Sequence, residues 1–193
     1  MVGVLGNAGL ALLELEESHP ARVAVTHIED AAIRASDLSK EVLAYSGKRK
    51  AVIEALDLAD VTRGMEHLLQ VSASKTASLL VDLAPEVPKI DGDAQQLQQV
   101  ILNLVTNAAE AVGMQSGTIT VSVGAQEVGR DYLAQTHFDD ELPDGTYVYF
   151  EVADTGCGMN VETQRRIFDP FFTTRSTGRG LGLAAVAGIV RAH

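Results

Sequence analysis

The sequence predicts an α+β fold, in which a helical hairpin precedes a sandwich that has helices on one face of a mixed, mostly antiparallel sheet. Three observations predict it. An apolar stripe with helical spacing runs from residue 28 to 45, a capped helix begins after Asp93, and residues 118–123 and 148–152 alternate apolar with polar or small side chains. We expect one unit over residues 1–50 and a second over residues 51–193.

The composition narrows the classes of partner that the chain can have. Its 193 residues include 15 Lys and Arg against 26 Asp and Glu, a formal net charge of -11. This charge repels nucleic-acid phosphates and anionic membrane surfaces, so we expect neither as a partner. The single cysteine, Cys157, excludes an intramolecular disulfide and a multi-cysteine metal site. No apolar run approaches the roughly 20 residues that cross a bilayer. We therefore expect a cytoplasmic location, and a membrane anchor elsewhere in a longer parent protein stays open.

Residues 1–50 predict two helices separated by a turn. The second has an apolar stripe with spacings of three and four, the seam of a coiled coil or helical bundle, formed by Ile28, Ala31, Ala35, Leu38, Val42 and Tyr45. An earlier stripe comprises Val4, Ala8, Leu12 and Leu15. Pro20 separates the two, because proline disfavours a helical conformation at His19. Two such helices bury too little surface alone, so we expect packing against a second copy or another domain.

Beyond a boundary near residue 50, the helical repeat gives way to shorter elements. Residues 52–58 predict a strand, residues 58–71 an amphipathic helix, and residues 79–83 a second strand. Asp93, with Gln96 three residues later, marks the N-terminus of the helix with the clearest pattern. Its apolar stripe comprises Leu97, Ile101, Leu104, Ala108 and Ala111.

Two strands with one buried face follow this helix. Their inward positions are Ile119, Val121 and Val123 in the first and Val148, Phe150 and Val152 in the second. Residues 124–145 between them are polar and rich in turn formers, and we predict a surface excursion with no identifiable chemistry. Residues 180–193 predict a last helix, without the strand that normally follows in an α/β layer.

The helix after Asp93 has a polar edge beside its apolar stripe. Asn103, Asn107 and Glu110 fall on one side of the helical wheel, where they would line the edge of a pocket. Asparagine is a poor helix former, so two of them one turn apart suggest a function. A solvated helix flank is the alternative interpretation.

Asp154 ends the second half-buried strand. It shares the parity of Val148, Phe150 and Val152, which places its carboxylate on the buried side, where an unpaired charge is costly. An exocyclic amine such as that of adenine would supply a donor, and the turn Thr155-Gly156-Cys157-Gly158 would let a ring lie close to the backbone. A simple strand-ending turn, with Cys157 as a small filler, is the alternative.

A glycine-rich segment opens the last helix. Gly178-Arg179-Gly180-Leu181-Gly182 follows the run from Ile167 to Arg175. Backbone N–H groups at a helix start, with Thr173, Thr174, Arg175 and Arg179 nearby, would make a polyphosphate cradle. The dinucleotide fingerprint and the Gly-x-x-x-x-Gly-Lys-Ser/Thr loop are both absent, so the phosphate clamp must be of another type.

Four segments resemble, in order, the N, G1, F and G2 boxes of bacterial sensor histidine kinases. They are Asn103-Leu-Val-Thr-Asn107-Ala-Ala-Glu-Ala, Asp154-Thr-Gly156-Cys-Gly158-Met, Phe168-Asp-Pro-Phe-Phe-Thr-Thr-Arg and Gly178-Arg-Gly180-Leu-Gly182-Leu. The third segment is most similar to the nitrogen-regulation branch. The resemblance implies the Bergerat ATP fold shared with gyrase, mismatch-repair and chaperone ATPases, here without its C-terminal strands. It implies phosphoryl transfer from MgATP to a histidine in two-component signalling.

The resemblance also assigns residues and partners. Asn107 would ligate Mg2+, Asp154 would bind the adenine amine, and residues 168–180 would form a mobile ATP lid, with Asn107 and Arg175 as catalytic residues. The other implied ATP contacts are Asn103, Glu110, Ala111, Gly156, Gly158, Met159, Ile167, Phe168, Thr173, Thr174, Gly178, Arg179, Gly180, Leu181, Gly182 and Leu183. Residues 1–50 resemble part of the dimerisation and histidine-phosphotransfer stem, so a second copy and a response regulator receiver domain are the implied partners. The family's pattern would continue beyond both ends of this chain.

Two departures from the family limit what the chain is expected to do. Asn103 stands where the related ATPases carry a water-activating glutamate, and an amide cannot accept a proton at neutral pH. None of the histidines, at positions 19, 27, 67, 137 and 193, has the context of the phosphate acceptor, so we do not expect the fragment to phosphorylate itself. Two alternatives stay open: an ATP-hydrolysing switch of the gyrase or chaperone kind, and a nucleotide-binding dimer that acts on a response regulator only by docking.

Overall fold

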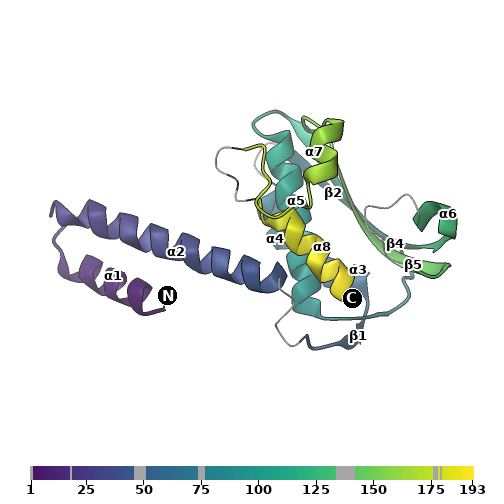
Figure 1. Cartoon of the computed structure of the whole chain (residues 1–193), viewed down its shortest axis with the longest axis horizontal. Coiled ribbons are helices and arrows are strands. Elements are labelled where there is room, and N and C mark those ends of the chain that lie inside the picture. The colour runs from purple at the N-terminus through teal and green to yellow at the C-terminus, as the bar shows by residue number, and fades with distance from the viewer. Residues whose placement is uncertain are drawn as a thin grey trace. The chain divides into compact units, whose positions relative to one another are not determined.

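The computed structural model describes the chain except for residues 1, 18, 46–50, 74–76, 134–141, 176–177 and 179, and it leaves out the side chains of residues 2, 34 and 36–45. The chain divides into two compact units, Met1–Arg49 and Lys50–His193 (Figure 1). Among the described residues, no helix combines the length and the apolar character that crossing a bilayer requires.

The first unit is a hairpin of helices α1 (Val2–Glu14) and α2 (Ala21–Tyr45), which confirms the two predicted helices. The guanidinium of Arg22 closes the turn. Its Nη1 atom donates hydrogen bonds of 2.7 Å to the carbonyl oxygens of Leu12 and Leu15, which have no helical partner at the end of α1. Thus an early residue of α2 satisfies the last carbonyl groups of α1.

The two helices meet through small side chains, since Ala8 of α1 and Ala32 of α2 are the buried residues among the described side chains of the hairpin. The predicted seam lies on another face of α2: Ile28 is 52% exposed, and Ala31 and Ala35 are exposed as well. Val4 of the first stripe is also exposed. The hairpin therefore leaves the described part of the seam uncovered; Leu38, Val42 and Tyr45 have side chains outside the described set.

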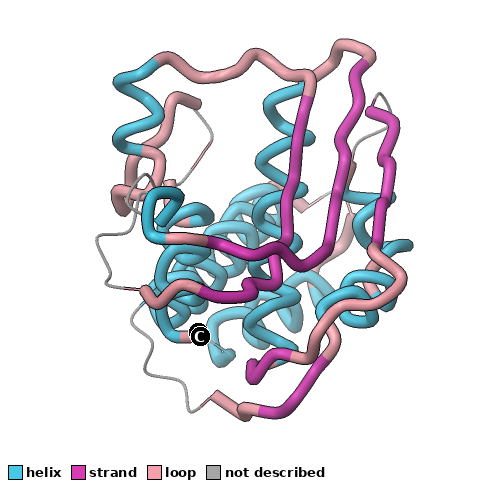
Figure 2. Tube along the Cα trace, turned by 90° about the vertical axis from the view of Figure 1, so that its right-hand side faces the viewer, coloured by secondary structure: helices cyan, strands magenta, loops and turns pink. Residues whose placement is uncertain are grey.

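The second unit contains two small sheets (Figure 2). β1 (Glu54–Leu56) pairs antiparallel with β3 (Ile90–Gly92). The larger sheet has the order β2-β4-β5, in which β2 (Ala77–Leu83) runs parallel to β4 (Gly117–Val128) and β4 runs antiparallel to β5 (Gly145–Asp154). The predicted mixed sheet is confirmed, whereas β3 was not predicted because three residues give no readable alternation.

Six helices are described in this unit: α3 (Leu58–Gly64), α4 (Glu66–Ser72), α5 (Ala94–Val112), α6 (Arg130–Leu133), α7 (Val161–Arg166) and α8 (Gly182–Ala192). The single helix predicted over residues 58–71 is wrong, because the chain breaks at the buried Met65 into α3 and α4. α7 was not predicted; its sequence signal is Asn160, whose side chain accepts from the Thr163 N–H at 2.8 Å as an N-cap.

The prediction of a surface excursion over residues 124–145 is wrong at both ends of this range, which belong to β4 and β5. β4 and β5 stay paired from Gly124, opposite Tyr149, to Val128, opposite Gly145. The misleading signal was Gly124, which suggests a turn. In the structure a Cβ there would lie 2.7 Å from the Tyr149 hydroxyl oxygen, so the aromatic side chain covers the glycine within the sheet. Residues 134–141 of this stretch are outside the described set.

Helix α5 is the centre of the second unit. Its Ile101 and Val105 are fully buried and pack with Val121 and Val123 of β4 in the main hydrophobic cluster. On another side, Val100 packs against Val186 and Ile189 of α8, which runs beside α5 in Figure 1. With two of its sides committed to packing, α5 has a fixed rotation about its own axis.

The start of α5 and the end of α8 are also tied by hydrogen bonds. The Asp93 carboxylate accepts from the N–H groups of Gln95 and Gln96 as the predicted N-cap, and from the Val52 N–H at 2.8 Å. The Nε2 atom of His193, at the end of α8, accepts from the Asp93 N–H at 3.0 Å. The start of α5 is thereby fixed to the end of α8 and to the residues before β1.

Candidate functional site

The two asparagines of α5 form a ladder that ends on α8. Asn107 Nδ2 donates to the Asn103 carbonyl oxygen at 2.8 Å, and Asn103 Nδ2 donates to the Gly182 carbonyl oxygen at 3.2 Å. Because each amide nitrogen is committed to a backbone oxygen, the Oδ1 atom of Asn107 is the end of that amide that remains to bind a ligand. A solvated helix flank would not require this arrangement.

The start of α8 lies directly beside this ladder. A Cβ added to Gly182 would lie 3.6 Å from Asn107 Nδ2 and 3.9 Å from Asn103 Cγ. The N-cap residue of α8, Leu181, makes no side-chain hydrogen bond, as is also the case for Met65 at the start of α4, whereas α3, α5 and α7 have side-chain N-caps. Uncapped first-turn N–H groups at a helix N-terminus attract anions, so this end of α8 suits a phosphate group.

Asp154 ends β5 at the edge of the same region. It pairs with the fully buried Ile119, so its side chain lies on the core-facing side of the sheet, as its parity predicted. The predicted burial is wrong, however, because the strand ends at this residue and the carboxylate is exposed. One carboxylate oxygen accepts from the Gly156 N–H at 2.8 Å, which leaves the other oxygen for an outside donor.

The turn after Asp154 rests on the C-terminal part of α5. The Cys157 N–H donates to the Ala111 carbonyl oxygen at 3.2 Å, and a Cβ on Gly156 would lie only 2.4 Å from the Ala111 carbonyl carbon. Thr155 fixes the turn from the other side, since its hydroxyl accepts from the Thr118 N–H at 2.9 Å. Glycine is therefore required at position 156, and Thr155 is a positioning residue that the sequence did not reveal.

A hydrogen bond joins two residues of the segment between α7 and α8. The Phe171 N–H donates to the Gly180 carbonyl oxygen at 2.8 Å. Gly180 has φ +67°, and a Cβ on it would lie 2.4 Å from the Phe172 carbonyl oxygen. Below this contact, the Arg166 guanidinium stacks on the Phe172 ring at 4.4 Å from its centroid. We call the described residues 171–175, 178 and 180 the lid segment.

Arg175 links the lid segment to α5. Its guanidinium forms an ion pair with Glu110 through Nη1, and Nη2 donates to the Asn107 carbonyl oxygen at 3.3 Å. Its backbone N–H donates to the Thr173 hydroxyl at 3.1 Å. Thus the lid arginine lies on the helix edge that carries the asparagine ladder.

The predicted site residues are therefore brought together in part. Asn103, Asn107, Glu110, Arg175 and Gly182 are joined by direct contacts, and Ala111 supports the turn of Gly156. Thr173 bonds within the lid segment, and Met159 is exposed, with its carbonyl oxygen accepting from Gln164. Arg179 lies outside the described residues.

A metal ion at this place would need ligands from more than the protein. Among the described residues there is no group of three or more His, Cys, Asp or Glu side chains that would hold a metal ion. The Oδ1 atom of Asn107 fits Mg2+, which prefers oxygen ligands and usually completes its shell with water and substrate phosphates. The donor set is therefore compatible with a metal that arrives with a polyphosphate.

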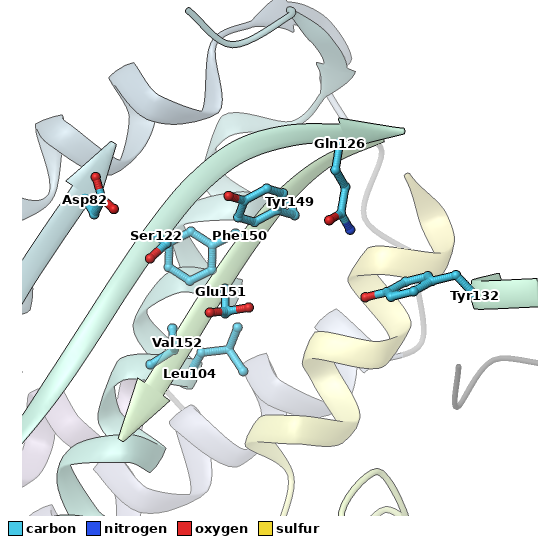
Figure 3. Close-up of a pocket in the computed structure, with 9 residues that line it drawn as sticks. All are labelled: Asp82, Leu104, Ser122, Gln126, Tyr132, Tyr149, Phe150, Glu151 and Val152. Atoms are coloured by element: carbon cyan, nitrogen blue, oxygen red, sulfur yellow. The ribbon is translucent and has the colours of Figure 1, made fainter. Parts of the chain in front are cut away.

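One hollow of the second unit lies elsewhere (Figure 3). It includes a polar row across the sheet, in which Asp82 lies opposite Ser122 and Ser122 opposite Glu151, and it reaches Tyr132 and Tyr149. None of the residues that line it belongs to the predicted nucleotide site. This hollow and the candidate site are therefore different parts of the second unit.

Comparison with known proteins finds similar sequences. Residues 92–193 match the family described as histidine kinase-, DNA gyrase B-, and HSP90-like ATPase. The chain is 33% identical to the sensor kinase CckA of Brucella abortus (strain 2308) over 99% of its length, and 33% identical to the sensory histidine kinase/phosphatase NtrB of Rhizobium leguminosarum bv. phaseoli over 97%. It spans 20% of the first protein and 49% of the second.

Solved structures show the same fold. The crystal structure of full-length ShkA in complex with AMPPNP matches with a TM-score of 0.73 and 26% identity, covering 98% of this chain and 37% of that one. The histidine kinase ThkA, crystallised in complex with the response regulator protein TrrA, matches with a TM-score of 0.55 and 21% identity, covering 90% of this chain and 47% of that one. At that identity the second match concerns the fold alone.

Proposed function

Because this chain belongs to the histidine kinase-, DNA gyrase B-, and HSP90-like ATPase family and contains the ATP-binding catalytic domain of a sensor histidine kinase, we propose that it binds MgATP at the edge of α5 and serves transfer of the γ-phosphoryl group to a histidine. One observation carries the proposal. The asparagine ladder of α5 meets the uncapped start of α8, and Arg175 lies on the same edge.

Each element of this edge has a part in the proposed site. Asp154 accepts a hydrogen bond from the adenine amine through its unused oxygen, and the glycines beside it let the ring approach the backbone. Asn107 offers its Oδ1 atom to Mg2+, which when bound neutralises charge on the phosphates. The first N–H groups of α8 and the guanidinium of Arg175 bind the phosphate oxygens. The AMPPNP bound in the related ShkA structure supports a triphosphate ligand.

Asn103 favours transfer over hydrolysis. Its amide is committed to the Gly182 carbonyl oxygen and has no lone pair basic enough to take a proton from water at neutral pH. In the proposed site no side chain of the ladder activates water, so the phosphoryl group is kept for an acceptor side chain. The structure gives no such support to the ATP-hydrolysing switch, and a negligible rate of ATP hydrolysis would exclude it.

The first unit supplies the proposed partner surface. Ile28, Ala31 and Ala35 are exposed on α2 at the spacing of a bundle seam, so we propose that a second copy of residues 1–50 covers them. A response regulator receiver domain is the proposed downstream partner, in line with the complex of ThkA and TrrA. A cytoplasmic location is proposed, since the lone cysteine suits a reducing compartment.

Calorimetric titration with a non-hydrolysable ATP analogue and Mg2+ tests the nucleotide site. Asp154→Asn should weaken binding by about tenfold or more, because an amide can turn its donor group toward the adenine amine and lacks the charge of the acceptor. Asp82→Asn, which removes the same charge from the far side of the sheet, is the matched control and should leave affinity unchanged. Equal affinity of Asp154→Asn and the parent chain would remove Asp154 from the adenine role.

Radioactive ATP tests the acceptor side of the proposal. The chain should bind MgATP without labelling itself, whereas a parent protein extended upstream of Met1 should be labelled on histidine, with an acid-labile and base-stable bond. Substitution of His19 or His27 in the extended protein should leave labelling nearly intact. Self-labelling of the present chain that is lost on changing either histidine would move the acceptor into the turn of the hairpin. A chain that docks to a response regulator while the extended protein stays unlabelled would favour the non-enzymatic alternative.

A further inference from the structure

Glu110 places a negative charge at the edge where the proposed site needs to bind phosphates. It lies three residues after Asn107 on α5, so both side chains project from the same part of the helix surface. An unpaired carboxylate in this position would repel a polyphosphate. The contact that Glu110 makes is therefore informative about how the site works.

That contact is the ion pair with Arg175, and it joins two different parts of the domain. The second guanidinium nitrogen, Nη2, donates to the Asn107 carbonyl oxygen. Arg175 therefore contacts α5 at two residues, Glu110 and Asn107. The Arg175 side chain is 34% exposed and that of Glu110 is 51% exposed, so the pair is accessible to solvent and to an incoming ligand. Partly exposed ion pairs are weak and exchange readily for a stronger partner.

A nucleotide phosphate is such a partner. The planar guanidinium binds phosphate oxygens with two parallel hydrogen bonds, and a triphosphate carries more charge than one carboxylate. Arg175 cannot give the same donors to Glu110 and to a phosphate at once. The two anions therefore compete for Arg175, and the loss of the ion pair reduces the net affinity for the triphosphate.

We propose that Glu110 is a positioning residue that acts through Arg175 rather than a nucleotide ligand: it latches Arg175 onto α5 while the site is empty, and the nucleotide phosphates must take Arg175 from it. The inference rests on the proposed nucleotide site, but it assigns Glu110 a role opposite to that of a binding residue. Glu110 sets how tightly Arg175 and its neighbours in the lid segment are held before ATP binds. It also favours ligands whose phosphate charge is large enough to break the ion pair between Glu110 and Arg175.

Substitution of Glu110 by Gln tests the latch. Affinity for the triphosphate analogue should rise about two- to fivefold, the equivalent of one partly exposed ion pair, whereas affinity for adenosine should stay unchanged because adenosine has no phosphate to compete. The gain should shrink in high salt, which screens the pair in the parent chain. Glu151→Gln, on the sheet face away from α5, is the matched control and should change neither affinity. Unchanged or weaker triphosphate binding by Glu110→Gln overturns the latch.

Two further measurements separate the latch from a structural role and from the nucleotide site. Arg175→Gln should weaken triphosphate binding, and it should reduce the gain from Glu110→Gln, because only the repulsion between the unpaired Glu110 and the phosphates is then left to remove; a gain as large as that in the parent chain overturns the inference. Without nucleotide, the amides of residues 171–175 should exchange faster in Glu110→Gln than in the parent chain, and equal rates contradict the latch. If the parent chain binds no nucleotide, the proposed function fails, while this exchange measurement still decides whether the ion pair holds the segment.

Discussion

Helix α5 and the lid segment border the same proposed site, but different interactions hold them. α5 is fixed by buried aliphatic side chains on two sides and by the Asp93 cap. The lid segment is held by the Phe171 to Gly180 hydrogen bond, by Phe172 beneath Arg166, and by the half-exposed pair of Arg175 with Glu110. We infer that α5 is a platform formed by folding, whereas the lid segment is arranged by what it binds.

The buried packing of α5 explains why this helix can carry polar residues at the proposed site. Folding energy comes from the apolar sides of α5, so its third side can carry residues that do not favour a helix, such as Asn103 and Asn107. The lid segment has no buried face of comparable size among its described residues. The free energy needed to rearrange it is therefore small. Substitutions in the two regions should have different consequences, in stability for the platform and in binding for the lid segment.

The largest effect should follow from Gly156→Ala. The new Cβ would lie 2.4 Å from the Ala111 carbonyl carbon, and the backbone of α5 cannot yield to it. We expect a loss of about 2 kcal/mol in unfolding free energy, together with weaker nucleotide binding, as the turn moves off the helix. Chemical denaturation measures the first and calorimetry the second. Gly158→Ala is the matched control: nothing lies near its Cβ, so only its φ of +64° should cost about 1 kcal/mol. Equal losses in the two variants would contradict the packing of the turn on α5.

Asn107→Ala should affect binding far more than stability. Folding loses one half-buried hydrogen bond, worth about 1 kcal/mol, whereas the Mg2+-dependent part of triphosphate affinity should fall about tenfold or more. Titration with and without Mg2+ separates the two. A fall of equal size in both conditions would remove Asn107 from the metal role.

The sequence predicted the platform better than the lid segment for a physical reason. The Asp93 cap and the stripe from Leu97 onward are local signals, and the four boxes, taken in order, predict the proposed site edge. The pairing of Arg175 with Glu110 depends on residues 65 positions apart, and the shielding of Gly124 by Tyr149 depends on strand register. Neither is visible in local periodicity. Burial of Asp154 was overestimated because parity gives the face of a strand but not where the core ends.

Gly180→Ala should disturb the lid segment and spare the platform. The substitution meets a positive φ and a contact of 2.4 Å with the Phe172 carbonyl oxygen, a clash as close as that at Gly156. We expect the free energy of local opening of the segment to fall by about 1–2 kcal/mol, while the free energy of global unfolding changes little. Hydrogen exchange should accelerate at residues 171–175 while the denaturation midpoint changes little. A midpoint shift as large as that of Gly156→Ala would mean that the two regions do not differ in kind.

The smallest effect should come from Phe171→Asn. Phe171 has φ +67° although its side chain is 67% exposed, so burial does not offset the strained backbone. Asparagine tolerates this conformation, and the segment should gain up to about 1 kcal/mol in local stability, read as slower exchange at the Phe171 amide. Faster exchange would show that the exposed ring contributes a contact that holds the segment.

Hydrogen exchange of the parent chain, with and without Mg2+ and a non-hydrolysable ATP analogue, tests the central claim most directly. The account predicts that amides in the buried turns of α5 exchange slowly in both states, whereas those of residues 171–175 are fast in the empty protein and slow when nucleotide is bound. Equal exchange of residues 171–175 in both states, at a nucleotide concentration that saturates calorimetric binding, would contradict it.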